Sequence, residues 1–82
     1  MKERIEVSLE KNIHMGDHRL QIRYGDSTYS GIIESGCDSN TLKIWLKDLK
    51  IPKELETEVR FKIFRKLTEQ GYNCIFLEGS RV

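Results

Sequence analysis

The sequence lacks the long apolar runs and the charge excess that define several broad classes of protein. No apolar run approaches the roughly 20 residues that span a bilayer. The N-terminal residues alternate in charge and lack the apolar core of a signal peptide. We therefore expect a cytoplasmic protein that does not enter a membrane. The formal charge of +1 gives no marked basic excess, so bulk charge offers no support for non-specific binding to nucleic acid.

Residues that could form a catalytic, cofactor or metal site are equally scarce. The two cysteines, Cys37 and Cys74, lie far apart, and we expect both to be free thiols in a reducing compartment. His14 and His18 are four residues apart, but a Gly-Asp turn signal lies between them, so we expect both to be exposed in a loop. No residues beside Cys37 indicate an activated thiolate, and no glycine-rich phosphate motif is present. We therefore predict no catalytic residue, no cofactor and no metal.

Alternation of apolar and polar residues predicts three short strands, over residues 4–10, 19–24 and 28–34. Glycine-containing turn signals separate these three segments. Gly31 interrupts the third strand, which predicts a bulge or a sharp bend there. The first strand is charged on its outer face, so we expect it at a sheet edge, where edge pairing offers a route to a homodimer.

Residues 41–49 fit two different elements, because a short apolar run does not distinguish a strand from a helix. As a strand, the segment points Leu42, Ile44 and Leu46 inward and Trp45 outward. As a helix, it places Trp45 in an apolar stripe and creates a helix-turn-helix arrangement with the next segment. We favour the strand, since it continues the preceding meander.

A long amphipathic helix is predicted from Pro52 to Gln70, with proline at its first position and Gly71 ending it. Its predicted buried stripe is Val59, Ile63, Phe64 and Leu67, extended at one end by Leu55, with Phe61 at the border of the stripe. Residues 72–77 then form a nearly continuous apolar strand, which predicts an interior position in the sheet and a buried Cys74. Residues 79–82 are expected to fray.

These elements predict one α+β domain over residues 1–82. It is a small antiparallel sheet of four to five strands in the order β-β-β-β-α-β, with one long helix packed on one face. A chain of 82 residues buries only about 60–65% of its unfolded surface, which leaves little room for a deep, dry catalytic pocket.

Two exposed surfaces are candidates for binding. On the outer sheet face, Lys43 and Trp45 are expected beside Gln21 and Arg23 of a neighbouring strand. An exposed tryptophan among basic residues is typical of a stacking platform for single-stranded nucleic acid or of a protein-binding hot spot. The second surface, on the outer face of the helix, consists of Phe61, Lys62, Arg65 and Lys66.

One loop has a limited resemblance to a known family. A strand containing Gly31 leads to a loop with Asp38 and Asn40 and then to another strand, and this order resembles an Sm-like β-barrel over residues 20–46. The resemblance implies a role for Asp38 and Asn40 in binding single-stranded RNA. The chain departs from that family because its long helix follows the strands, and we do not assign it to the family.

The sequence therefore favours a small, non-catalytic binding module that acts through contacts with another protein. A single-stranded RNA binder that uses the tryptophan-containing sheet face is the alternative. The state of Trp45 discriminates between the two hypotheses. Exposure of Trp45 on the sheet among basic neighbours favours nucleic-acid binding, whereas its burial removes the best candidate residue from both.

Overall fold

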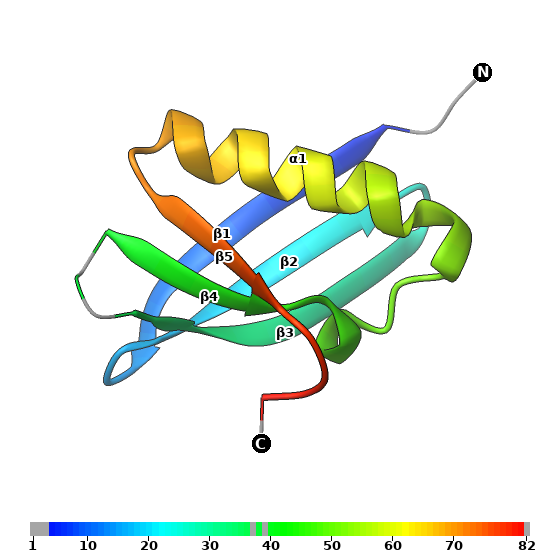
Figure 1. Cartoon of the computed structure of the whole chain (residues 1–82). Helices are drawn as coiled ribbons and strands as arrows, with labels where there is room; N and C mark the ends of the chain where they lie inside the picture. The colour runs from blue at the N-terminus through cyan, green and yellow to red at the C-terminus, as the bar shows by residue number, and fades with distance from the viewer. Residues whose placement is uncertain (1–3, 37, 39, 82) are drawn as a thin grey trace.

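In the part of the chain that the structure describes, five strands and one long helix follow one another in the predicted order (Figure 1). The computed structural model describes residues 4–36, 38 and 40–81. The strands are β1 (Ile5–His14), β2 (Asp17–Tyr24), β3 (Ser27–Ser35), β4 (Thr41–Trp45) and β5 (Asn73–Leu77). The helix α1 (Glu56–Glu69) is preceded by two 3₁₀ turns, η1 (Leu46–Leu49) and η2 (Lys53–Leu55). The predicted α+β class is confirmed.

The sheet is mixed rather than wholly antiparallel. Its strand order is β1-β2-β3-β4-β5, and the first three pairings are antiparallel. β4 and β5 are parallel, because α1 carries the chain back across the sheet between them. The predicted edge position of β1 is confirmed. The predicted interior position of β5 is wrong, because this strand forms the opposite edge.

Both edge strands pack against α1, which bridges the two ends of a strongly curved sheet (Figure 1). The core side chains of the sheet point toward the helix. The buried ones are Ile5, Leu20, Ile22, Ile33, Leu42 and Ile44. Val59, Ile63 and Leu67 of α1 pack in the same core. Phe64 was predicted to belong to this stripe, but its side chain is 49% exposed. The reason is rotational, since Phe64 lies about 100° around the helix from Ile63.

The strand limits differ from the predicted ones where the backbone is irregular. β1 continues to His14 through a shift in register between Glu10 and His14, so the break in alternation after Glu10 marks an irregular strand rather than its end. Residues 41–45 form the favoured strand, but the chain then turns into η1 and buries Leu49 in the core beside β3. Neither a strand nor an α-helix therefore covers the whole of residues 41–49.

Gly31 has a role other than the predicted bulge. The β2–β3 register runs without interruption through Gly31, which pairs with Leu20. A Cβ atom built on Gly31 would lie 3.1 Å from Cδ2 of Leu49, closer than ordinary van der Waals contact. Glycine therefore lets η1 pack closely against the middle of β3.

The long helix begins later than predicted but ends where predicted. The predicted start at Pro52 is early, because Pro52 caps the 3₁₀ turn η2 and α1 itself begins at Glu56. The predicted end is confirmed within one residue, with Gln70 as the C-cap. Gly71 follows with φ of 91°, a left-handed conformation that glycine adopts without steric cost.

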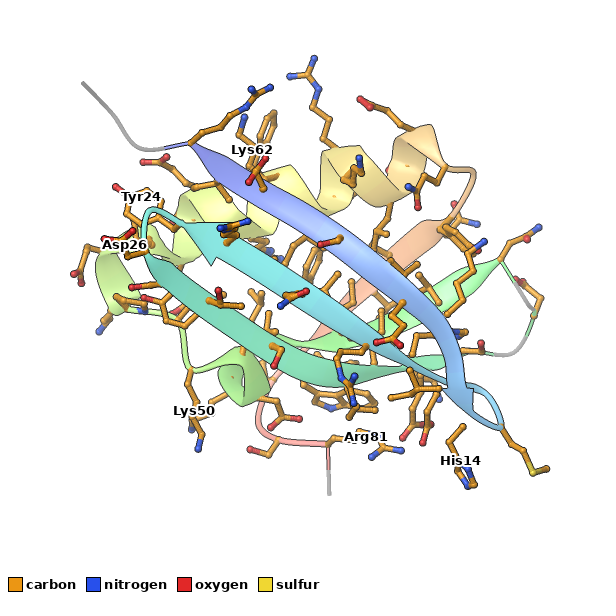
Figure 2. All side chains as sticks on the ribbon, turned by 180° about the vertical axis from the view of Figure 1, so that it is seen from behind. His14, Tyr24, Asp26, Lys50, Lys62 and Arg81 are labelled. Carbon is orange, nitrogen blue, oxygen red and sulfur yellow. The ribbon has the colours of Figure 1, made fainter. Side chains whose placement is uncertain are left out.

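Residues 79–81 are anchored through Arg81, contrary to the predicted fraying, and Val82 lies outside the described residues. The Arg81 guanidinium donates from Nε to Glu34 at 2.5 Å and from Nη2 to Asp17 at 2.9 Å, and its backbone N–H donates to Asp48 at 3.0 Å. Burial acts to lower the pKa of Arg81, but the hydrogen bond to Glu34 and the charges of Asp17 and Glu34 outweigh burial and raise that pKa. Arg81 lies across the molecule from Lys62 of α1 (Figure 2).

Candidate functional site

The two flanks of α1 differ in chemistry. The flank beside β1 carries the predicted basic residues Lys62, Arg65 and Lys66, which line a hollow of about 410 Å³ with residues 4–7. Glu69 also lines this hollow, and its carboxylate lies 4.0 Å from Arg65 in an exposed ion pair. Such a pair contributes little free energy, and the acidic groups offset part of the positive charge.

The flank beside β5 is mainly apolar. Phe61 is 60% exposed and Phe64 is 49% exposed, and both line a second hollow of about 410 Å³. The other lining residues are Thr57, Arg60, Cys74 and Phe76. The Arg60 guanidinium lies 5.0 Å from the centre of the Phe76 ring, in a cation–π contact. Phe61 was predicted as part of the basic surface, but it lines this apolar hollow instead.

The free edge of β5 adjoins this hollow. The N–H of Asn73 donates to the C=O of Asn40 at 2.7 Å, so the backbone groups of Asn73 point toward β4. Successive residues of a strand direct these groups to alternate sides, so the N–H and C=O groups of Cys74 and Phe76 point away from the sheet. We call Phe61, Phe64, Cys74, Phe76 and the adjoining edge of β5, including Ile75, the α1–β5 flank.

The β5 edge lacks the features that protect β1 from edge pairing. β5 contains no charged residue and no proline, and its Ile75 side chain is 43% exposed. β1 carries charged residues along its outer face and has an irregular register near its end. Edge strands commonly use charges and bulges to prevent association with other strands. The structure thus leaves one edge open, next to two exposed phenylalanines.

Cys74 is half-buried on this flank, whereas the sequence predicted full burial. The difference follows from the edge position of β5, which leaves one side of the strand without a neighbour. Burial raises the pKa of the Cys74 thiol. A raised pKa reduces the thiolate fraction at neutral pH, so Cys74 has the character of an apolar contact residue rather than a nucleophile.

The predicted sheet platform is not assembled as expected. β3 lies between β2 and β4, so Lys43 and Trp45 are not on a strand adjacent to Gln21 and Arg23. Arg23 is opposite Glu6 in the β1–β2 register, and Lys43 is opposite Glu34 in the β3–β4 register. Trp45 is half-buried. Each of the two basic side chains therefore has an acidic residue as its neighbour on the next strand.

The histidines do not form the exposed loop that was predicted. His14 is exposed at the end of β1, but His18 lies within β2 and is only 7% exposed. Its Nε2 forms a hydrogen bond of 2.8 Å with Oγ of Ser35. Among residues 4–36, 38 and 40–81, no cluster of three or more His, Cys, Asp or Glu side chains could hold a metal ion. Cys37 lies outside the described residues.

The Asp38 carboxylate stabilises its own loop. Its Oδ1 accepts hydrogen bonds from the backbone N–H of Asn40 at 2.9 Å and from the Thr41 hydroxyl at 3.0 Å. These bonds form a local turn in which the aspartate oxygen caps the following backbone. The RNA-binding role that the Sm-like resemblance implies for Asp38 would compete with these two bonds.

Comparisons with protein-family models, curated proteins and solved structures found no match. Within the described part of the chain, no helix is both long enough and apolar enough to cross a membrane. The candidate site consequently depends on geometry alone. The apolar residues Phe64, Ile75 and Phe76 were not predicted as binding residues, because the sequence pattern assigned them to the core or to an interior strand.

Proposed function

We propose that this protein is a non-catalytic module that binds another protein through the α1–β5 flank. The observation that carries the proposal is the placement of two exposed phenylalanines beside an open, uncharged strand edge. Exposed apolar patches on small domains commonly mark interaction sites. An open edge also allows a partner to add a strand through backbone hydrogen bonds, while nearby pockets select its side chains.

The exposed aromatic area supplies part of the free energy that binding needs. Phe61 and Phe64 are 60% and 49% exposed. At about 200 Å² for each whole side chain, they together present roughly 200 Å² of aromatic surface. Burying that area would contribute about 5 kcal/mol at 25 cal/mol per Å². Since association itself costs about 4–15 kcal/mol, backbone pairing and further apolar contacts are needed for stable binding.

The test compares affinity capture by the wild type, by the Phe61→Ser/Phe64→Ser variant and by a matched Lys62→Ser/Lys66→Ser control. Each captured protein is then purified, and its binding to the same three forms is measured directly. We expect the phenylalanine variant to lose at least about tenfold in affinity, since each buried aromatic side chain commonly contributes more than 1 kcal/mol. We expect the lysine variant to bind like the wild type. Equal binding by all three forms would refute the proposal.

The alternative function, binding of single-stranded nucleic acid on the outer sheet face, receives weaker support. The acidic neighbours of Arg23 and Lys43 offset the charge that a phosphate backbone would need. We expect single-stranded oligonucleotides at low salt to leave the fluorescence of Trp45 unchanged. Salt-sensitive quenching of Trp45 would instead favour the nucleic-acid function.

A further inference from the structure

We infer that the α1–β5 flank binds a second copy of this chain, with the two β5 strands paired antiparallel across a two-fold axis. The inference rests on the proposed function, because it names the protein that occupies the same surface. Its basis is the self-complementarity of β5 in backbone register, in side-chain chemistry and in charge.

The backbone register of this pairing follows from which groups of β5 point outward. The outward N–H and C=O groups belong to Cys74 and Phe76, two residues apart. In an antiparallel pair, Cys74 would face the partner's Phe76, and Phe76 would face the partner's Cys74. Each pair exchanges two N–H···O bonds, so four backbone hydrogen bonds form about the two-fold axis. Ile75 then lies on the axis opposite the partner's Ile75.

The side chains on both faces of the strand suit this register. On the helix side, Phe61 and Phe64 of each copy extend the contact made by Cys74 and Phe76, because all four line one hollow. On the other side, the half-exposed Ile75 meets the partner's Ile75. β5 contains no charged residue, so the two-fold axis brings no like charges into opposition within the strand.

Charges just beyond the strand are complementary in the same register. Continuing the pairing outward places Glu78 opposite the partner's Tyr72. In each copy, the Lys11 ammonium lies 4.8 Å from the centre of the Tyr72 ring. Glu78 is exposed and would therefore approach the partner's Lys11, and the two-fold axis repeats this contact.

The size of the interface indicates a weak and reversible dimer. Two copies would bury roughly 400 Å² of phenylalanine surface, given about 200 Å² exposed on each. Even with Ile75 and the strand backbone, this area stays below the range of about 1,200–2,000 Å² for stable complexes. We therefore expect a monomer–dimer equilibrium that depends on concentration in the micromolar range or above.

Disulfide trapping of the whole chain tests the register. In a Cys37→Ser background, Ile75→Cys would place two thiols on the axis, where opposed residues have Cα atoms about 4.5 Å apart. This spacing allows a disulfide bond. The matched control is Asn73→Cys, an exposed position on the same face of β5. Its Cα would lie roughly 14 Å from that of the partner's residue 73, given about 3.4 Å per residue.

We expect Ile75→Cys to form covalent dimers at least about tenfold faster than Asn73→Cys under mild oxidation. Sedimentation equilibrium of the wild type should show dimers, Ile75→Lys should be monomeric, and Met15→Lys, at an exposed turn on another part of the surface, should behave like the wild type. Equal cross-linking rates, or a wild type that stays monomeric up to about 1 mM, would overturn the inference. If capture of another protein still depended on Phe61 and Phe64, the proposed function would stand without self-association; if that dependence were also missing, both would fall.

Discussion

Substitution of two adjacent helix residues separates the role of the core from that of the α1–β5 flank. Ile63 and Phe64 are neighbours in sequence, and the hydrophobic pattern assigned both to the buried stripe. In the structure, Ile63 is fully buried, whereas Phe64 is 49% exposed. We predict that Ile63→Ala greatly reduces the free energy of unfolding, while Phe64→Ala reduces it much less.

The magnitudes follow from burial. Removing a fully buried isoleucine side chain costs about 2–5 kcal/mol, because the contacts are lost and a cavity remains. A domain of this length has a total stability of about 4–12 kcal/mol, at 0.05–0.15 kcal/mol per residue. Ile63→Ala therefore removes a large share of it. Phe64→Ala loses only part of the roughly 3–5 kcal/mol typical of a buried phenylalanine. The greater helix propensity of alanine returns about 0.5 kcal/mol, so we expect a net loss of about 1 kcal/mol.

Urea denaturation monitored by the fluorescence of Trp45 and by circular dichroism measures both changes. The protein concentration must be low, because dimerisation through Phe64 would stabilise the native state by mass action and enlarge the apparent effect of Phe64→Ala. An equal loss of stability in the two variants at low concentration would show that α1 has a different rotation about its axis. The core and flank assignments would then both be wrong.

Three further substitutions or conditions test separate parts of the structure. Arg81→Ala should increase amide hydrogen exchange in residues 78–81. Arg81→Lys should restore little protection, because lysine lacks the guanidinium fork. Equal exchange in the wild type and both variants would refute the anchoring role. Gly31→Ala should destabilise the protein by about 1–3 kcal/mol in urea denaturation through overpacking against Leu49. Leu49→Ala in the same chain should relieve part of that cost. A double variant whose loss of stability equals the sum of the two single losses would contradict the contact. Burial raises the pKa of the Cys74 thiol above its ordinary value. The native state is therefore most stable below the ordinary thiol pKa, and stability is lost as the pH rises through the raised pKa of the folded thiol. Cys74→Ser should weaken this alkaline decline.

Element types were predictable from the sequence where local pattern and tertiary environment agree. β2 alternates strictly, and both Leu20 and Ile22 are fully buried as the period of two predicts. Gly71 ends α1 because a left-handed residue is required there, which is a local property of the chain. Phe61, predicted to be incompletely buried, is 60% exposed.

Positions that depend on contacts distant in sequence were not predictable in this way. The apolar run of β5 predicted an interior strand, but hydrophobicity alone does not determine whether a strand has neighbouring strands on both sides or on one side only. Gly31 was interpreted locally as a bulge, although its neighbour Leu49 is 18 residues further along the chain. Arg81 was expected to fray, since its carboxylate partners Asp17 and Glu34 are brought to it only by the folded sheet.

The character of each helix flank follows from the edge strand beside it. α1 lies between the two ends of a curved sheet, so its sides face β1 and β5 rather than solvent alone (Figure 1). Beside β1, whose edge is charged and irregular, the helix presents Lys62 and Lys66. Beside β5, whose edge is uncharged, it presents Phe61 and Phe64. If Phe61 and Phe64 only supported the fold, burial would protect them as it protects Ile63. Their exposure next to the open edge is therefore the reason for assigning binding to this flank. Exchanging the two chemistries, with lysine at 61 and 64 and phenylalanine at 62 and 66, should abolish pairing of β5 with a second copy while α1 keeps its core contacts.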